Sequence, residues 1–307
     1  MGAVTGKRCL VTGATGFMGR RLTALLLERG AAVRALVRSR ERARAVLPAG
    51  GVELVEGDMT DRAAVERAAD GMETVFHLAT ADPRSDPHFD ATNVKGMETV
   101  VSVLEERGPR RIVYTGSSVA LSAGRSRYGE SKRREAGILT SSKLDYTVII
   151  PSQVFGEGYD KNINRLLALI RRLPVVLVLG DGRYRLQPVY AGDVVEALLL
   201  AARSERAVGR SYFIAGPEAV SFNDLVDRAA RAMGLRRRRV HVPLWLVKAP
   251  ALLLEKVFAG APVTAEKIER AVRDNTFDIE AARRDLGYRP TPLDEALART
   301  VGERRPS

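Results

Sequence analysis

Short apolar runs alternate with helical patterns through the first half of the chain. Runs rich in valine, leucine and isoleucine predict buried strands at positions 8–12, 32–37, 52–56, 74–78, 111–115 and 146–150. Between them, apolar residues recur every three or four positions and predict helices over 19–29, 91–106 and 128–139. Strands that alternate with helices in this way are typical of an α/β fold with a doubly wound parallel sheet.

The pattern changes after Pro151, which ends the sixth predicted strand. The later pattern predicts helices over 162–172 and 194–202, and strands at 175–179, 187–190 and 211–215. The remainder is expected to be mostly helical. We therefore expect one domain over 1–155 that holds the large sheet, and a smaller, mostly helical region over 156–307. The strands near 175–190 and 211–215 are candidates to return to the first sheet.

The composition is that of an ordinary globular protein. Of 307 residues, 45% are hydrophobic and 28% are charged, no uninterrupted run of eighteen apolar residues occurs, and nothing at the N-terminus resembles a signal peptide. Cys9 is the single cysteine, so no internal disulfide can form, and with only three scattered histidines we expect no metal site. We expect a cytoplasmic protein without a transmembrane segment.

Basic residues outnumber acidic ones, 49 to 37, which gives a formal net charge of +12. Such a surface attracts nucleic acid, acidic lipid and phosphorylated ligands without specificity. No basic motif with interleaved aromatic residues is present, so we expect no specific nucleic-acid partner. A compact basic run at 236–239 precedes an apolar stretch over 242–258. We expect this stretch to line an apolar substrate pocket. The alternative is that it makes peripheral contact with a membrane surface.

A glycine-rich segment joins the first predicted strand to the first predicted helix, with the spacing GxxGxxG. In such a segment the first glycine permits a tight turn, the second lets a pyrophosphate approach the backbone, and the third lets helix and strand pack closely. The helix N-terminus also stabilises an anion. The segment predicts a Rossmann-type dinucleotide site, and its cofactor-binding candidates are Gly13, Thr15, Gly16, Phe17, Met18 and Gly19.

The end of the second predicted strand indicates which dinucleotide binds. Sites for NAD usually carry an acidic residue there, which hydrogen-bonds to the ribose. This strand ends without one and is followed by Arg38, nineteen positions after Gly19. An arginine can hold a 2′-phosphate through paired, charge-assisted hydrogen bonds. We therefore favour NADP(H) as the cofactor, with NAD(H) as the alternative.

A candidate catalytic trio lies further along the chain. Ser117 follows the fifth predicted strand, and Tyr128 and Lys132 lie four positions apart at the start of the next predicted helix, on one helical face. Free tyrosine has a pKa of about 10, which a neighbouring ammonium lowers because it favours the phenolate. A serine hydroxyl can orient and polarise a substrate carbonyl. We predict that all three are catalytic and that Lys132 also binds the cofactor ribose.

These motifs resemble the extended short-chain dehydrogenase/reductase family, also called the NAD-dependent epimerase/dehydratase family. The matching segments are VTGATGFMG (11–19), EGDMTD (56–61), FHLAT (76–80), NVKG (93–96), VYTGSS (113–118), YGESK (128–132), IPSQVFGEG (150–158), QPVYAGDVVEAL (187–198) and NTFDIEAARRDLGYRP (275–290). The resemblance implies further cofactor-binding residues: Asp58 and Met59 beside the adenine, Ala79, Thr80 and Asn93 at the cleft, and Pro151 and Ser152 beside the nicotinamide. Asn93 could instead bridge backbone segments, and Asp58 could end a strand. Dimerisation through helices around 91–106 and 132–139 is common in this family.

The resemblance implies an NAD(P)H-dependent oxidoreductase that transfers hydride to or from a carbonyl or secondary-alcohol carbon, with Tyr128 as general acid or base and a substrate-binding second region. Two alternatives stay open: a nucleotide-sugar epimerase or dehydratase, and a non-catalytic NADPH-binding accessory protein similar to a subunit of respiratory complex I. The spacing of eleven positions between Ser117 and Tyr128 resembles an atypical branch of the family. Arg185 lies one position from where a diphosphate-binding arginine would align, which weakens the sugar-nucleotide alternative. The intact trio opposes the accessory role.

Overall fold

The computed structural model describes residues 5–81, 86–121, 126–159, 163–257 and 265–302. The chain divides into two compact units. The first unit holds Met1–Pro151, Ala191–Ile214 and Asp278–Arg289, and the second holds Ser152–Tyr190, Ala215–Phe277 and Pro290–Ser307. The second half of the chain thus supplies two segments to the first unit. The first of them includes nearly all of the strand predicted at 211–215, whereas the strands predicted near 175–190 belong to the second unit.

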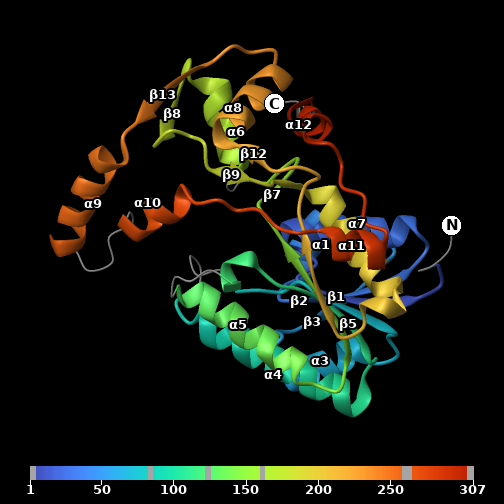
Figure 1. The fold of residues 1–307 in the computed structure, drawn as a ribbon. Helices are drawn as coiled ribbons and strands as arrows, with labels where there is room; N and C mark the ends of the chain where they lie inside the picture. The colour runs from blue at the N-terminus through green and yellow to red at the C-terminus, as the bar shows by residue number, and fades with distance from the viewer. Residues whose placement is uncertain (1–4, 82–85, 122–125, 160–162, 258–264, 303–307) are drawn as a thin grey trace. The chain divides into compact units, whose positions relative to one another are not determined.

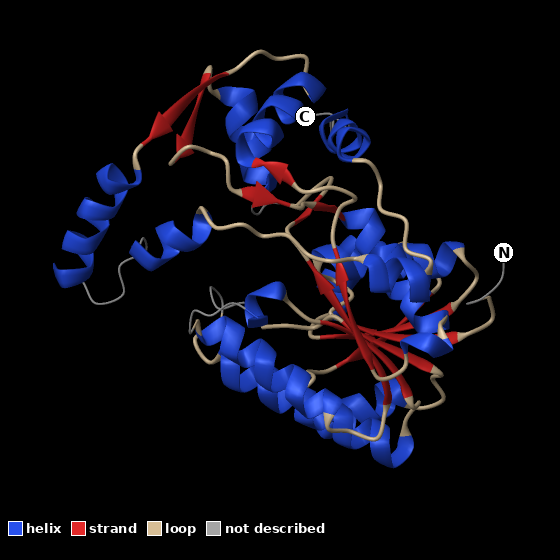
Figure 2. Ribbon diagram, viewed as in Figure 1, coloured by secondary structure: helices blue, strands red, loops and turns tan. Residues whose placement is uncertain are grey.

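The first unit is built on a seven-stranded sheet in which every neighbouring pair of strands is parallel. The strands lie in the order β11-β6-β5-β4-β1-β2-β3 (Figure 1, Figure 2). Their bounds are β1 Arg8–Thr12, β2 Ala32–Val37, β3 Val52–Glu56, β4 Thr74–His77, β5 Arg111–Thr115, β6 Asp145–Pro151 and β11 Arg210–Ile214. The order reverses at β1, because β2 and β3 are added on one side of it and the later strands on the other. Ligands of such sheets bind at this reversal, beyond the carboxyl ends of the strands.

Helices cover both faces of this sheet (Figure 1). One face carries α3, α4 and α5, and the other carries α1, α7 and α11. The helices of this unit are α1 Phe17–Glu28, α2 Arg40–Val46, α3 Arg62–Ala69, α4 Phe89–Arg107, α5 Arg127–Thr140, α7 Ala191–Arg203 and α11 Glu280–Leu286. Leu10, Met97 and Ile112 form part of the core and are at most 1% exposed. Burial of each such side chain stabilises the fold by roughly 1.5–3 kcal/mol. The doubly wound α/β architecture expected from the alternating pattern is confirmed.

The returning segments are attached to the first unit by a strand and by polar contacts. β11 pairs in parallel with β6 at the edge of the sheet. Asp285 of α11 accepts hydrogen bonds from Arg210 at 3.0 Å and from the hydroxyl of Tyr212 at 3.1 Å, and both donors belong to β11. The helix is therefore tied directly to the edge strand, which explains why residues so late in the sequence belong to this unit.

The second unit contains helices and three two-stranded sheets. Its strands pair as β7 (Val154–Phe155) with β10 (Val189–Tyr190), β9 (Arg185–Leu186) with β12 (Val220–Ser221), and β8 (Val175–Leu179) with β13 (Arg238–Val242). Its helices are α6 Ile163–Arg172, α8 Phe222–Ala232, α9 Leu244–Val257, α10 Ala265–Ala271 and α12 Leu293–Gly302. Leu167, Leu225 and Leu297 bring α6, α8 and α12 into one core. Within the described ranges, no helix has both the length and the apolar character needed to cross a bilayer.

Candidate active site

The glycine loop between β1 and α1 has no room for side chains at two positions. Gly13 has a φ of +72°, and a Cβ there would lie 2.6 Å from the backbone nitrogen of Ala79. A Cβ at Gly19 would lie 2.1 Å from the carbonyl oxygen of Gly13. Gly16 is the N-cap residue of α1 and has no side chain to cap the helix, and the first turn of α1 contains no acidic residue. The loop thus offers a helix N-terminus that fits the pyrophosphate of a dinucleotide.

Below this loop, the ends of β1 and β4 are joined by buried polar side chains. Oγ1 of Thr12 lies 2.9 Å from Nδ1 of His77 and accepts a hydrogen bond from the N–H of Ala79 at 3.3 Å. Burial, followed by the charge of Lys132, lowers the pKa of His77 to about 3. The imidazole is therefore neutral, and it acts here as a fixed partner of Thr12 rather than as a charged group.

Three candidates for the adenosine half of the cofactor follow β2 and β3. Arg38, the first residue after β2, is exposed, and no other described residue forms an ion pair or a hydrogen bond with its side chain. The carboxylate of Asp58 accepts hydrogen bonds from the N–H and the hydroxyl of Thr60, at 2.9 and 2.8 Å. Met59 is buried against α4, where a Cβ at Gly96 would lie 2.6 Å from its Cγ. Arg38 is thus the most accessible of the three, while Met59 is part of the core.

The catalytic candidates lie on α5 and in the segment after β5. The hydroxyl of Ser126 caps α5 by accepting a hydrogen bond from the N–H of Gly129 at 3.0 Å. Tyr128, in the first turn, is half-buried, and its ring centroid lies 6.5 Å from that of Phe89 on α4. Lys132 follows one turn later on the same helix. Ser117 is half-buried beyond the end of β5, where its hydroxyl accepts a hydrogen bond from the N–H of Val119 at 3.3 Å.

Lys132 is held in a buried polar cluster that sequence reasoning did not find. Its Nζ lies 2.9 Å from Oε2 of Glu135 and 3.4 Å from the hydroxyl of Tyr114. Tyr114 donates to the same carboxylate at 2.9 Å, and Ser131 donates to Oε1 at 3.0 Å. Burial and the charge of Glu135 raise the pKa of Tyr114 well above its ordinary value, so this phenol stays protonated. The sequence signals were an acidic residue three positions after Lys132 and a tyrosine inside a buried strand.

Asn93 connects two segments near this cluster. Its Oδ1 accepts a hydrogen bond from the N–H of Ala81 at 2.6 Å, and its Nδ2 donates to the hydroxyl of Ser131 at 3.4 Å. This fully buried amide therefore joins the segment after β4 to α5, which is the bridging arrangement that the sequence left open. In that segment Ala79 is half-buried and Thr80 is exposed.

The last two cofactor candidates fall on either side of the division between the units. Pro151 ends β6 of the first unit, and Ser152 begins the second. The hydroxyl of Ser152 donates to the carbonyl oxygen of Gln187 at 2.6 Å. The side chain of Gln187 in turn donates to the carbonyl oxygen of Gly216 and accepts from the N–H of Phe277, each at 2.8 Å. Ser152 thus belongs to a hydrogen-bonded crossing of four chain segments.

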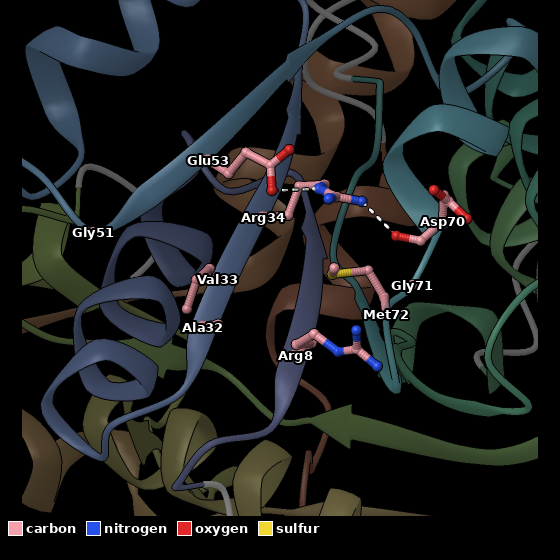
Figure 3. Close-up of a pocket in the computed structure, with 9 residues that line it drawn as sticks. All are labelled: Arg8, Ala32, Val33, Arg34, Gly51, Glu53, Asp70, Gly71 and Met72. Carbon is pink, nitrogen blue, oxygen red and sulfur yellow. Dashed lines mark hydrogen bonds and ion pairs between the residues drawn. The ribbon is translucent and has the colours of Figure 1, made fainter.

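A cavity of about 420 Å³ opens at the amino ends of the strands, opposite the carboxyl ends where the glycine loop lies (Figure 3). Its lining lies at the amino ends of β1 to β4: Arg8, Ala32, Val33, Arg34, Gly51, Glu53, Asp70, Gly71 and Met72. Arg34 pairs with Glu53 at 2.8 Å and donates to the carbonyl of Asp70 beyond α3. The guanidinium of Arg34 is therefore already paired with a carboxylate and with the carboxyl end of α3. The cavity also lies away from the carboxyl ends of the strands, where the candidate residues gather. Across the described residues, no group of three or more histidine, cysteine, aspartate or glutamate residues is arranged to hold a metal ion.

Comparison with known proteins identifies the family. The model of the NAD dependent epimerase/dehydratase family matches residues 9–215. The chain is 30% identical to the 3 beta-hydroxysteroid dehydrogenase/Delta 5-->4-isomerase of Mycobacterium tuberculosis, over 92% of this chain and 86% of that protein. It is 29% identical to the 4-hydroxy-2-methyl-3-oxo-4-farnesyl-3,4-dihydroquinoline-1-oxide ketoreductase of Stigmatella aurantiaca, over 92% of this chain and 91% of that one. The solved structure of Bordetella bronchiseptica WbmH in complex with NAD+ has the same fold, with a TM-score of 0.74, 22% identity and coverage of 97% and 98% of the two chains.

The chain therefore belongs to the NAD-dependent epimerase/dehydratase family. The dehydrogenases and reductases among its relatives support an NAD(P)-dependent oxidoreductase. The resemblance first seen in the motifs is confirmed.

Proposed function

We propose that this protein is an NADPH-dependent oxidoreductase of lipophilic ketones or secondary alcohols, with Tyr128 as its general acid or base. The observation that carries the proposal is the position of Tyr128 one helical turn before the buried Lys132 on α5. The glycine loop at the end of β1 supplies the second requirement, a place for a dinucleotide.

Tyr128 transfers a proton between its phenolic oxygen and the substrate oxygen. The ordinary pKa of tyrosine, about 10, leaves little phenolate at neutral pH, and the nearby ammonium of Lys132 favours that phenolate. In reduction the phenol donates its proton to the substrate oxygen, and in oxidation the phenolate accepts it. Ser117 is proposed to orient the same substrate oxygen through its hydroxyl.

The proposed cofactor is NADP(H), which supplies hydride for reduction and accepts it in oxidation. The loop from Gly13 to Gly19 would hold its pyrophosphate, and the exposed guanidinium of Arg38 would hold its 2′-phosphate. If Arg38 does not contact the 2′-phosphate, NAD(H) is the alternative cofactor. Lys132 would bind the ribose, and the other proposed cofactor contacts are Asp58, Met59, Ala79, Thr80, Asn93, Pro151 and Ser152.

A lipophilic substrate is supported by the names of the two relatives, a steroid dehydrogenase and a reductase of a farnesylated quinoline. It is also supported by three exposed apolar side chains of the second unit, here together called the apolar surface: Leu177, Val240 and Trp245, which are 66%, 47% and 67% exposed. Leu177 and Val240 are register partners on β8 and β13. The exposed side chains of Arg236 and Arg238 stand just before and within β13. We propose that the apolar surface touches an anionic membrane from which substrate is taken.

A second copy of the chain is the partner we propose for α4 and α5, which lie side by side on one face of the sheet (Figure 1). Light scattering of the purified protein tests this proposal, because a dimer gives twice the mass of 33.5 kDa.

The first experiment is NADPH oxidation by the purified chain with a panel of sterol ketones, long-chain 3-oxo compounds, quinones and UDP-sugars. Net NADPH consumption with a lipophilic ketone supports the proposal. Conversion of a UDP-sugar without net NADPH consumption supports an epimerase. Against that alternative, Arg185, which lies near the expected position of a diphosphate-binding arginine, already donates to the carbonyl of Ala219 at 3.0 Å. Tight NADPH binding without turnover of any compound supports the accessory role.

A further inference from the structure

We propose that Glu135 is a positioning residue that fixes the ammonium of Lys132 and opposes its charge, so that Tyr128 stays protonated to higher pH than beside an unopposed lysine. This inference rests on the proposed function, in which Tyr128 moves the proton. The sequence motif contains only Tyr128 and Lys132, and the inference adds Glu135 as a third ionisable group.

The ion pair is fully inside the protein. Lys132 and Glu135 are three positions apart on α5, and their side chains are only 3% and 1% exposed, with Nζ and Oε2 2.9 Å apart. A buried charge without a partner is costly, because water no longer solvates it. Each charge therefore stabilises the other, and the ammonium is kept at the carboxylate by more than helical spacing.

The carboxylate of Glu135 is itself held in place from two further directions. Its Oε2 accepts from the hydroxyl of Tyr114 on β5, and its Oε1 accepts from the hydroxyl of Ser131. Ser131 is in turn linked to Asn93 of α4. Three donors on one carboxylate fix its rotamer, so the position of the ammonium is set by the sheet and by α4 as well as by α5.

The other ionisable groups around the pair leave Glu135 as the counter-charge. His77 of β4 is electrostatically coupled to Lys132 and is neutral. Tyr114 of β5 is a protonated donor, and Tyr146 of β6 belongs to the same core as Tyr114. From α4 the cluster receives the uncharged Asn93. Among these described neighbours, the negative charge facing Lys132 is that of Glu135.

Tyr128 precedes Lys132 by one turn on α5. It is coupled electrostatically to Tyr114, whose hydroxyl touches both Glu135 and Lys132. An ammonium near a phenol favours the phenolate, and a carboxylate bound to that ammonium weakens the effect. Removal of the carboxylate charge should therefore lower the pKa of Tyr128.

The test is direct titration of Tyr128 by ¹³C NMR in the full chain labelled at the ζ carbon of tyrosine. Tyr128→Phe assigns the signal. We expect Glu135→Gln, which keeps the shape and one oxygen that can still accept from Lys132 and Tyr114, to lower the pKa of Tyr128 by about one unit. Glu135→Asp, which retains the charge one methylene further back, should lower it by about half as much and restore most of the wild-type pH profile of kcat/KM.

Glu130→Gln is the matched control. It removes the same charge from the same helix, but Glu130 is exposed and pairs with Arg133 at the surface. Its Tyr128 signal should titrate as in the wild type. The inference is overturned when Glu135→Gln titrates like the wild type, titrates higher, or shifts no more than Glu130→Gln does. Where Glu135→Gln does not fold, an unchanged titration in Glu135→Asp overturns it equally. Because the NMR titration needs no turnover, its result is separate from the proposed function, which is tested by the substrate panel and by the activity of Tyr128→Phe.

Discussion

The Nδ1 atom of His77 lies 2.9 Å from Oγ1 of Thr12, with both side chains at most 2% exposed at paired positions of β4 and β1. Burial is the main reason that the pKa of His77 falls to about 3. In the unfolded chain the imidazole has an ordinary pKa of about 6.5. Between these two values the unfolded chain binds a proton that the folded protein does not bind.

We predict that His77 makes the protein less stable as the pH falls below 6.5. Above about pH 6.5 both states hold a neutral imidazole, and the contribution is fully present. Below it, the free energy of unfolding falls by up to about 1.4 kcal/mol per pH unit, until the pH approaches 3. In urea unfolding, the wild type should lose about 2 kcal/mol more between pH 7 and pH 5 than His77→Asn does. The exposed His88→Asn is the control and should behave as the wild type, and equal losses in all three proteins would refute the assignment.

Gly19→Ala should abolish tight cofactor binding. A Cβ at Gly19 would lie 2.1 Å from the carbonyl oxygen of Gly13, whereas a Cβ at Gly137 on α5 meets nothing within 4 Å. Calorimetry should show NADPH affinity reduced by about a hundredfold, which is about 2.7 kcal/mol. Gly137→Ala should keep its affinity and gain up to about 1 kcal/mol of stability from the better helix former. Unchanged affinity in Gly19→Ala would remove the loop from the site.

Arg38→Gln should remove the preference for NADPH. If the exposed guanidinium holds the 2′-phosphate, loss of this charged contact should weaken NADPH binding by at least about tenfold and leave NADH binding nearly unchanged. Arg40→Gln is the control, because Arg40 lies two positions away and faces Glu56 at 3.6 Å. Equal losses for both cofactors, or none for NADPH, would count against the assignment of Arg38.

The apolar surface should direct the protein to anionic vesicles. We expect flotation with phosphatidylglycerol vesicles and little with phosphatidylcholine, because Arg236 and Arg238 add charge attraction to apolar insertion. Leu177→Ser combined with Trp245→Ser should reduce the bound fraction by about half or more. Val46→Ser alters an exposed apolar side chain of the first unit and should have no effect. Equal binding by all variants would assign the membrane contact elsewhere.

The sheet was predictable because each of its strands is a local apolar run. The six early strands were expected within about one residue of the observed bounds, since buried parallel strands need nearly continuous apolar residues. The helices α2 and α3 were missed because they are short, with 7 and 8 residues, and α2 buries only Ala43. The pattern also missed β7, β9, β12 and β13. A two-residue strand such as β12 has no periodicity, and β13 carries two arginines.

The candidate site was predictable where its residues stand at a fixed spacing along the chain. The glycine loop and the pair Tyr128 and Lys132 are such cases. The partners of Lys132 were not, because Tyr114 comes from β5 and only the fold brings its hydroxyl to Glu135. Likewise, nothing local indicated that Met59 would pack into the core against Gly96.

The proposed mechanism gives Tyr128 the role of moving the proton. It is tested most directly by Tyr128→Phe, assayed for NADPH oxidation with the best substrate of the panel, beside the control Tyr146→Phe. Phenylalanine keeps the aromatic ring beside Phe89 and removes only the hydroxyl. We predict that kcat falls by about 10²–10⁴-fold in Tyr128→Phe, with NADPH affinity within about twofold of the wild type, and that Tyr146→Phe stays active. A Tyr128→Phe protein that retains more than about a tenth of the wild-type rate would contradict the proposed mechanism.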